Sequence, residues 1–311
     1  MYFPYLRGKQ FELLALRELA SLPLDNSKIS PVIEPLKTDT RAIKAMVRAM
    51  PEELLIHLIV NPEFGEIRNS NPVISDLVVA FHQEGHKNVN PAFIISANRD
   101  LELLKIFLKK YRFDETGYSL IHLNQIAGMT ELSALVASTN CTFNIIQVGH
   151  IIALRRSFPK RSLVYLADPF NRQQKNADYE TINDENFSND HLYYKEEGFV
   201  GFGDYLTIGS AFIDGGRLPW AVVIHLTYLD KGSKNIRIGH FVSDSNQDDD
   251  DTAGKFAEAL KKLISFIDAN EIHSVATETF RDLHLRGAYP GLGSIKKLSI
   301  MHHIELVQSQ L

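Results

Sequence analysis

The sequence has one cysteine, no long apolar run and no excess of basic charge. Cys141 is the single cysteine among 311 residues, so one chain can form neither an internal disulfide nor a thiolate metal cluster. No stretch approaches the roughly 18 uninterrupted apolar residues of a membrane helix, and Met1–Arg7 lacks the apolar core of a signal peptide. We therefore expect a soluble cytoplasmic protein.

The chain also lacks a strong charge of one sign. Its formal net charge is −5, and 44% of its residues are hydrophobic, which is ordinary for a globular protein. A domain that binds nucleic acid directly usually carries a basic field. This chain has no such overall basic charge, so only a local basic patch could bind nucleic acid directly.

What the chain does contain is a repeated alternation of short apolar runs with helical patterns. The first run leads into Pro31–Lys37, where prolines flank a carboxylate, Glu34. The predicted strands are 28–35, 54–60, 92–96, 118–123, 142–148 and 163–167, and the predicted helices are 10–22, 40–50, 72–86, 98–111, 129–138 and 151–158. These strands are apolar on both faces, which is typical of a parallel sheet covered by helices. The alternation predicts an α/β protein.

Two α/β architectures fit this alternation. One is a (β/α)8 TIM-barrel-like domain, and the alternative is an open doubly wound parallel sheet. No glycine-rich turn follows the first predicted strand, as a dinucleotide-binding sheet would require, and this favours the barrel. We expect a single barrel-like domain over residues 1–311, with regular βα units over 1–170.

The regular alternation ends after residue 170. Residues 171–198 are polar, and we interpret them as a long excursion. A seventh strand at 199–208 has interior glycines, which indicate a bulge or a close approach of two backbones. A hairpin over 220–229 and 235–242 is predicted to add to the last barrel strand or to replace it, and helices are expected at 252–270, 275–285 and 295–308.

Sites in barrels and open α/β sheets form at the carboxyl ends of the strands. Four residues within or just after predicted strands are candidates for acid/base chemistry: Glu34, His150, Asp168 and Asp204. Glu34 lies among apolar residues, so it must have a partner or a shifted pKa, and a structural ion pair with Arg7 or Lys9 is the alternative. Asp168-Pro169 is also a common start of a turn.

The other polar residues near strand ends have simpler explanations. Asn61, Ser96 and Asn124 are good capping or turn residues, and His57 and His122 lie inside strands as expected for core histidines. Adjacent helical side chains diverge, so His302 and His303 cannot chelate one ion.

Two glycine-containing strings could contact a ligand. Gly201–Tyr205 could present backbone N–H groups beside Asp204, and Tyr289–Lys297 could bind phosphate at the start of the last helix through Lys296 and Lys297. The second string is not a P-loop, and an ordinary helix with exposed lysines is the alternative. The residues assign no metal site and no cofactor.

Four segments together resemble one family: residues 5–12, 31–35, 201–205 and 291–303. They are similar to the Beta-protein family, named after a T-even phage protein, and to its bacterial branch labelled "sce". The resemblance implies a genomic setting near phage-defence genes, often beside a small nuclease-like partner, and it implies no known catalytic residues. The positions that match the family are Arg7, Lys9, Glu12, Glu34, Gly203, Asp204, Tyr205, Lys296, Lys297, His302 and His303.

Two functions therefore stay open. The first is a component of a bacterial anti-phage defence system that binds or regulates a nuclease-like protein, or senses a phage product. Nucleic acid would then be contacted only through the partner, and Arg7, Lys9, Tyr205, Lys296, Lys297 and His302 are its candidate binding residues. The alternative is a barrel hydrolase or phosphodiesterase that uses Glu34, Asp168, Asp204 and His150.

Overall fold

The computed structural model describes residues 1–311 except 23–24, 69–71, 214 and 216–218. These residues form two compact units. The first comprises Met1–Leu13, Ala20–Ala167 and Asp190–Asp204, and the second comprises Leu14–Leu19, Asp168–Asn189 and Tyr205–Leu311. The expectation of one domain stays a prediction, and each unit is described by itself.

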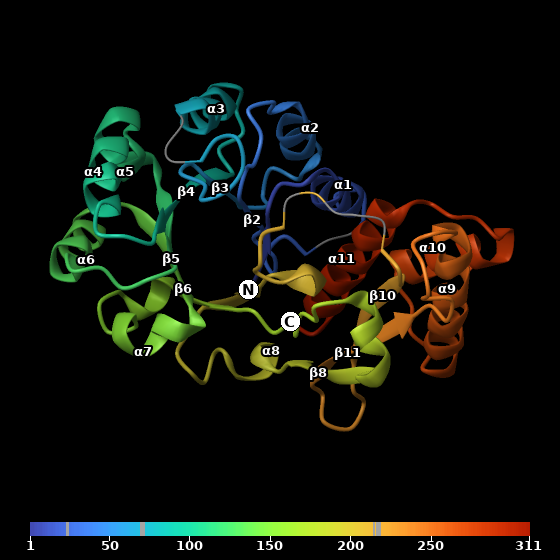
Figure 1. Ribbon diagram of the computed structural model, residues 1–311. Coiled ribbons are helices and arrows are strands. Elements are labelled where there is room, and N and C mark those ends of the chain that lie inside the picture. Colours follow the sequence, from blue (N-terminus) through green and yellow to red (C-terminus); the bar gives the residue numbers. More distant parts are fainter. Residues whose placement is uncertain (23–24, 69–71, 214, 216–218) are drawn as a thin grey trace. The chain divides into compact units, whose positions relative to one another are not determined.

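The first unit is a closed barrel of eight parallel strands in the order β1-β2-β3-β4-β5-β6-β7-β9. The strands are β1 (Tyr2–Leu6), β2 (Val32–Ile33), β3 (Ile56–Ile59), β4 (Val89–Ile95), β5 (Tyr118–His122), β6 (Cys141–Gln147), β7 (Leu163–Ala167) and β9 (Gly201–Asp204). Helices alternate with the strands, and α2, α3, α4, α6 and α7 lie around the outside of the barrel (Figure 1). The predicted TIM-barrel-like fold is confirmed, and the open sheet is not.

The helical segments between the barrel strands are close to the predicted ones. They are α1 (Gln10–Leu19), α2 (Arg41–Ala49), α3 (Pro72–Gln83), α4 (Asp100–Tyr111), α5 (Phe113–Thr116), α6 (Met129–Ser138), η1 (Val148–His150), α7 (Ile151–Leu154), η2 (Lys160–Ser162) and α8 (Asp190–Tyr193). The segment predicted as a helix over 151–158 is only one turn long. No helix among the described residues is long and apolar enough to cross a membrane.

The eighth barrel strand is β1 rather than the predicted hairpin. β1 pairs with β2 on one side and with β9 on the other, and this closes the barrel. Pro4 lies in the middle of β1, and proline has no N–H for a ladder hydrogen bond. β1 was not among the predicted strands.

Phe3 fills the barrel interior at this closure. Its ring contacts His57 of β3 and Phe143 of β6, with centroid separations of 5.6 and 5.1 Å. A Cβ atom at Gly201 would overlap the Phe3 ring, and one at Gly203 would overlap the Phe3 carbonyl oxygen. The glycines of β9 therefore permit the close approach of β1, as one interpretation of the sequence predicted.

The predicted core histidines are confirmed as buried. His57 is hydrogen-bonded to Ser30 and Asn90, and burial lowers its pKa to about 3. His122 is hydrogen-bonded to Asn144, and burial lowers its pKa to about 4. Both rings are therefore neutral structural groups at physiological pH.

The second unit contains a three-stranded antiparallel sheet in the order β10-β11-β8. The strands are β8 (Asp184–Ser188), β10 (Val223–Leu229) and β11 (Ile236–Val242), and the helical segments are η3 (Asn176–Thr181), η4 (Leu206–Ile208), α9 (Thr252–Ala269), α10 (Val275–Arg286) and α11 (Leu292–Ser309). The predicted hairpin is β10–β11. The predicted polar excursion contributes η3, the third strand of this sheet, and α8 of the barrel unit.

Helices pack on both faces of this second sheet. Phe266 of α9 contacts Tyr228 and Phe241 on one face. His303 of α11 is hydrogen-bonded to Thr227, and residues 227 and 228 point to opposite faces because side chains alternate along a strand. The sheet is therefore a buried middle layer, which explains its apolar sequence.

The barrel closure leads to the first prediction. Gly203→Ala should destabilise the protein by roughly 1–3 kcal/mol, because the added methyl group overlaps backbone that cannot move away. Urea denaturation measures the free energy of unfolding. Gly149→Ala is the matched control, since a Cβ there meets no atom within 4 Å. Equal stability of the two variants would show that β1 and β9 are not tightly apposed.

Candidate functional site

Glu34 lies at the carboxyl end of β2 and is almost completely buried, at 1% exposure. Its carboxylate accepts hydrogen bonds from the Tyr5 hydroxyl at 2.9 Å and from the Glu63 backbone N–H at 2.8 Å. Arg7 Nε lies 3.8 Å from Glu34 Oε2. Burial raises the pKa of Glu34, while Arg7 and the two hydrogen bonds oppose that shift. The alternative of an ion pair with Arg7 therefore describes its environment.

The loop between β1 and α1 positions Arg7. The Glu12 carboxylate accepts hydrogen bonds from the backbone N–H groups of Arg7, at 2.6 Å, and Lys9, at 3.4 Å. Gly8 has a φ of +59°, and a Cβ there would lie 3.0 Å from the Glu34 carbonyl oxygen. Burial raises the pKa of Glu12 to about 7, against the effect of these hydrogen bonds and of Lys9 and Arg7. Residues 7–12 therefore hold Arg7 in position beside Glu34.

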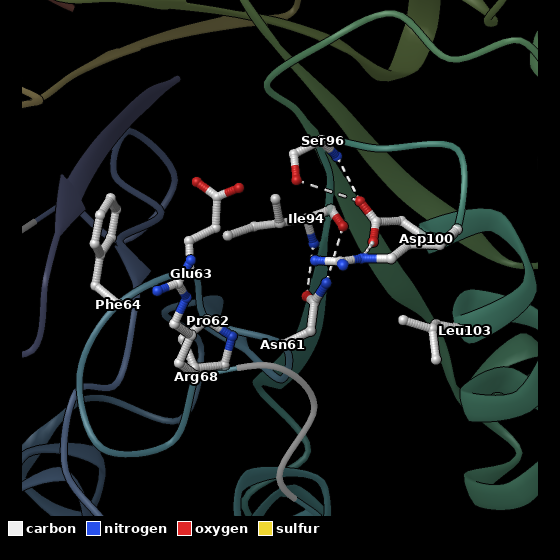
Figure 2. A pocket seen from close by; sticks show the side chains of 10 residues that line it. Asn61, Pro62, Glu63, Phe64, Arg68, Ile94, Ser96, Asp100 and Leu103 are labelled. Carbon is white, nitrogen blue, oxygen red and sulfur yellow. Dashed lines mark hydrogen bonds and ion pairs between the residues drawn. The ribbon is translucent and has the colours of Figure 1, made fainter.

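A pocket of about 530 Å³ opens at the carboxyl ends of β3 and β4. Its lining residues are Asn61, Pro62, Glu63, Phe64, Arg68, Ile94, Ser96, Arg99, Asp100 and Leu103. Phe64, Glu63 and Arg68 line one side, and Ser96, Asp100 and Leu103 line the other (Figure 2). Arg7 connects the pocket to Glu34, because its guanidinium carbon lies 4.7 Å from the centre of the Phe64 ring.

The polar residues at the base of the pocket hold the backbone. Asn61 accepts a hydrogen bond from the Ile94 N–H and donates one to the Ile94 carbonyl, as Figure 2 shows. Asp100 accepts hydrogen bonds from the N–H groups of Ser96 and Ala97 at the start of α4. Asn61 and Ser96 were predicted to cap a helix or form a turn, whereas Asn61 holds the backbone of β4 and Ser96 donates its N–H to Asp100. Arg68 and Arg99 remain exposed at the rim.

Asp204 lies on the other face of the barrel wall from Glu34. Its carboxylate accepts a hydrogen bond of 2.7 Å from the Tyr2 hydroxyl, whereas Glu34 accepts one from Tyr5. Tyr2 and Tyr5 point to opposite faces of β1, and Phe3 shows that the face of Tyr5 is the interior. The structure therefore does not bring Glu34 and Asp204 together, because alternation along β1 places their partners on opposite faces of the barrel wall.

The other predicted residues are distributed over both units. In the first unit, His150 is partly exposed at the end of η1, and Lys9 is exposed. In the second unit, exposed Asp168 accepts a hydrogen bond from the Ser210 N–H at 2.9 Å, and Tyr205 is buried. Within the described ranges, no three His, Cys, Asp or Glu side chains are placed to hold a metal ion.

The predicted residues of the last helix are largely engaged inside the second unit. Lys297 forms an ion pair with Glu18 at 2.6 Å. Both ring nitrogens of His302 are engaged within the protein: Nδ1 is hydrogen-bonded to the Ser274 hydroxyl, and Nε2 to the Thr227 carbonyl. Lys296 is exposed. The helix begins at Leu292, three residues before the predicted start at 295.

Comparison with known proteins adds no family assignment. The chain matches no protein-family model, and a search of curated proteins gives no match. The resemblance to the Beta-protein family therefore stays an expectation.

Sequence reasoning missed most of the pocket. Glu63, Phe64, Arg68 and Arg99 lie in loops after β3 and β4, two or more residues beyond the strand ends. The prediction considered only the first polar residue after each strand. Arginines in the loops after two consecutive strands were the available signal, since such loops meet at one rim of a barrel.

The raised pKa of Glu12 predicts a pH dependence of stability. Between pH 4.5 and about 7 the folded protein retains a proton that the unfolded chain has lost, so stability should fall as the pH rises. Glu12→Gln should remove up to about 3 kcal/mol of that fall, measured by urea denaturation across this range. Exposed Glu53 gives the control, Glu53→Gln, and an unchanged slope in Glu12→Gln would contradict the prediction.

The buried ion pair gives a second pH-dependent prediction. Arg7→Met leaves Glu34 buried without the Arg7 guanidinium. This should lower the free energy of unfolding by about 3–5 kcal/mol when Glu34 is ionised. The loss should grow as the pH rises above the ordinary glutamate pKa, because a protonated Glu34 needs no cation. Denaturation at several pH values measures it, and the double variant Arg7→Met/Glu34→Gln should recover stability at high pH. A pH-independent loss would mean that only packing was removed.

Proposed function

We propose that the barrel unit is a binding module of a bacterial anti-phage defence system, and that its pocket receives an acidic segment of a nuclease-like partner protein. The observation that carries this proposal is the pair of exposed arginines, Arg68 and Arg99, at the rim of the pocket at the carboxyl ends of β3 and β4. The resemblance to the Beta-protein family supplies the setting. Nucleic acid would be contacted only through the partner.

The chemistry of the barrel mouth supports binding over catalysis by the predicted carboxylates. Glu34 is engaged by Arg7, Tyr5 and the Glu63 backbone, and Asp204 faces away from the interior. A general base must reach the proton it removes, and neither carboxylate has a position from which it could reach a ligand in the pocket. Glu34 instead holds the loop that carries Glu63 and Phe64 by accepting a hydrogen bond from the Glu63 N–H.

The pocket itself combines an apolar surface with charge at its rim. Phe64, Ile94 and Leu103 provide the apolar area, and the arginine guanidinium groups present donors that match a carboxylate in a bidentate manner. A volume of about 530 Å³ accommodates a few side chains of an extended segment. Asp or Glu beside an apolar residue is therefore the partner sequence that fits best.

Charge reversal at the rim tests the proposal. The double variant Arg68→Glu/Arg99→Glu should lose co-purification with the product of the neighbouring gene, by at least about tenfold in affinity, because two attractive contacts become repulsive. It should also lose protection in a phage plaque assay. Retained binding and retained protection would both contradict the proposal.

Arg156→Glu is the matched control for the charge change. Arg156 is exposed on the same unit and does not line the pocket, so this variant should bind and protect like the wild-type protein. Loss of binding in the control as well would indicate a general dependence on net charge. That result would remove the pocket from the explanation.

A further inference from the structure

The connection between β6 and β7 carries basic residues and no acidic ones. Residues 132–167 include no aspartate or glutamate, although the chain as a whole has a net charge of −5. The cations of this connection form what we call the basic patch, and all of them are exposed: Arg155, Arg156, Lys160 and Arg161. A protein that is acidic overall therefore has a local basic surface on its barrel unit.

The cations of the basic patch have no acidic partner. Over the described ranges of the chain, none of their side chains forms an ion pair or a hydrogen bond. Other cations on the barrel helices are paired, such as Arg48 with Glu84 at 2.9 Å and Lys105 with Glu131 at 2.5 Å. The charge of the basic patch is therefore available to an anionic partner.

Two apolar side chains project from the same connection. Val148 is 48% exposed and Ile152 is 88% exposed. They lie in η1 and α7, which follow each other directly, and helical residues four apart lie on the same side of the helix. Val148 and Ile152 are therefore neighbours on the outer surface of the barrel unit.

Buried side chains determine which side of the connection faces outward. Ile151 and Leu154, three residues apart, are both buried and so lie on the inner side of α7. Phe158 is also buried, and its ring centroid lies 4.6 Å from that of His122 in β5. These contacts hold the connection against the barrel, so Ile152 is presented outward without any rearrangement.

The basic patch begins directly beside the apolar pair. The Arg155 N–H donates to the Ile151 carbonyl at 2.9 Å, so the helical turn continues as far as Arg155. Arg155 and Arg156 are thus three and four residues beyond Ile152 and lie one turn from it. The other two cations follow in η2. Apolar side chains and cations therefore share one outer surface.

We propose that the basic patch, together with Val148 and Ile152, binds the surface of an anionic phospholipid membrane. The four cations contact the phosphate and carboxylate groups of the lipid headgroups. The two aliphatic side chains enter the boundary between the headgroups and the acyl chains. This binding surface belongs to the barrel unit and is independent of the pocket at β3 and β4.

A lipid surface fits these side chains better than a nucleic acid does. Both carry phosphate groups that attract lysine and arginine. Proteins hold the bases of nucleic acids by stacking them on aromatic rings, whereas Val148 and Ile152 are aliphatic. Aliphatic groups gain when they leave water for the hydrocarbon edge of a bilayer. The exposed apolar pair therefore favours the membrane.

Vesicle sedimentation with the full chain tests the proposal. The wild-type protein should bind vesicles made of phosphatidylcholine and phosphatidylserine in equal parts, and should not bind pure phosphatidylcholine. The triple variant Arg155→Gln/Lys160→Gln/Arg161→Gln should bind at least about tenfold more weakly, because each basic group near an anionic surface adds to the attraction. No binding by the wild-type protein, or wild-type binding by the triple variant, would overturn the proposal.

A matched control separates the basic patch from total charge. Lys87→Gln/Lys109→Gln/Lys110→Gln removes the same charge from exposed lysines elsewhere on the barrel unit, so it should bind like the wild-type protein. An equal loss in both triple variants would overturn the assignment to the patch. Arg156 is unchanged in both, and co-purification involves no bilayer, so Arg156→Glu is still a control for binding at the pocket.

A fluorescent side chain at position 152 measures insertion directly. Trp220 is the single tryptophan, so the double variant Trp220→Phe/Ile152→Trp reports on position 152 alone. Its emission should shift to shorter wavelength on the anionic vesicles and be quenched by lipids with brominated acyl chains. Trp220→Phe/Ile106→Trp, at an exposed position of α4, should show neither effect. An unshifted emission at position 152 would overturn the insertion of Ile152.

A duplex oligonucleotide tests the competing ligand. Ile152→Ser should weaken the binding of anionic vesicles severalfold, because it removes aliphatic surface from the bilayer boundary. A wild-type protein that bound the duplex through the basic patch, without binding vesicles, would replace the membrane by nucleic acid. In that case Ile152→Ser would leave the affinity for the duplex unchanged.

Discussion

The barrel depends on β1, because this strand joins β9 to β2 and thereby closes the wall. The closure works only where the backbone of β9 can approach Phe3, and Gly201 and Gly203 leave that space free. Each residue of β1 is buried, so its polar groups require partners inside the protein. Tyr2 finds Asp204 on the outer face, and Tyr5 finds Glu34 on the inner face.

This constraint explains why polar residues at the strand ends are not by themselves a catalytic set. A carboxylate at 1% exposure must be neutralised or hydrogen-bonded, and Glu34 has Arg7, Tyr5 and a backbone N–H for that purpose. The contacts that satisfy it also fix the loop that carries Glu63 and Phe64. The pocket is therefore supported by the buried groups, while Arg68 and Arg99 are exposed at its rim and Arg99 Nε lies 3.8 Å from Asp100 Oδ1.

The sequence predicted the barrel well because helical and apolar periods are local properties. Six strands and their helices could be placed from runs such as 54–60 and 118–123. β1 was not counted because Pro4 interrupts its ladder, and the hairpin was assigned to the barrel because nothing in its alternation distinguishes one sheet from another.

The candidate sites were less predictable, since side-chain partners depend on register. The face on which Asp204 points follows from its pairing with β1, and a shift of one residue would have placed it beside Glu34. The sequence did indicate Arg7 as a partner of Glu34, because a buried carboxylate has few acceptable partners. It could not indicate the pocket rim, which lies in loops beyond the strand ends.

The contacts among His225, His240 and Glu185 in the second sheet could not be predicted from the sequence either. His225 and His240 are 15 residues apart, and Glu185 is 55 residues from His240, so no motif spacing connects them. Antiparallel pairing places them side by side, and the carboxylate then determines which nitrogen holds each proton. The candidate carboxylates of the barrel likewise have partners that only the folded register brings together, Tyr5 for Glu34 and Tyr2 for Asp204.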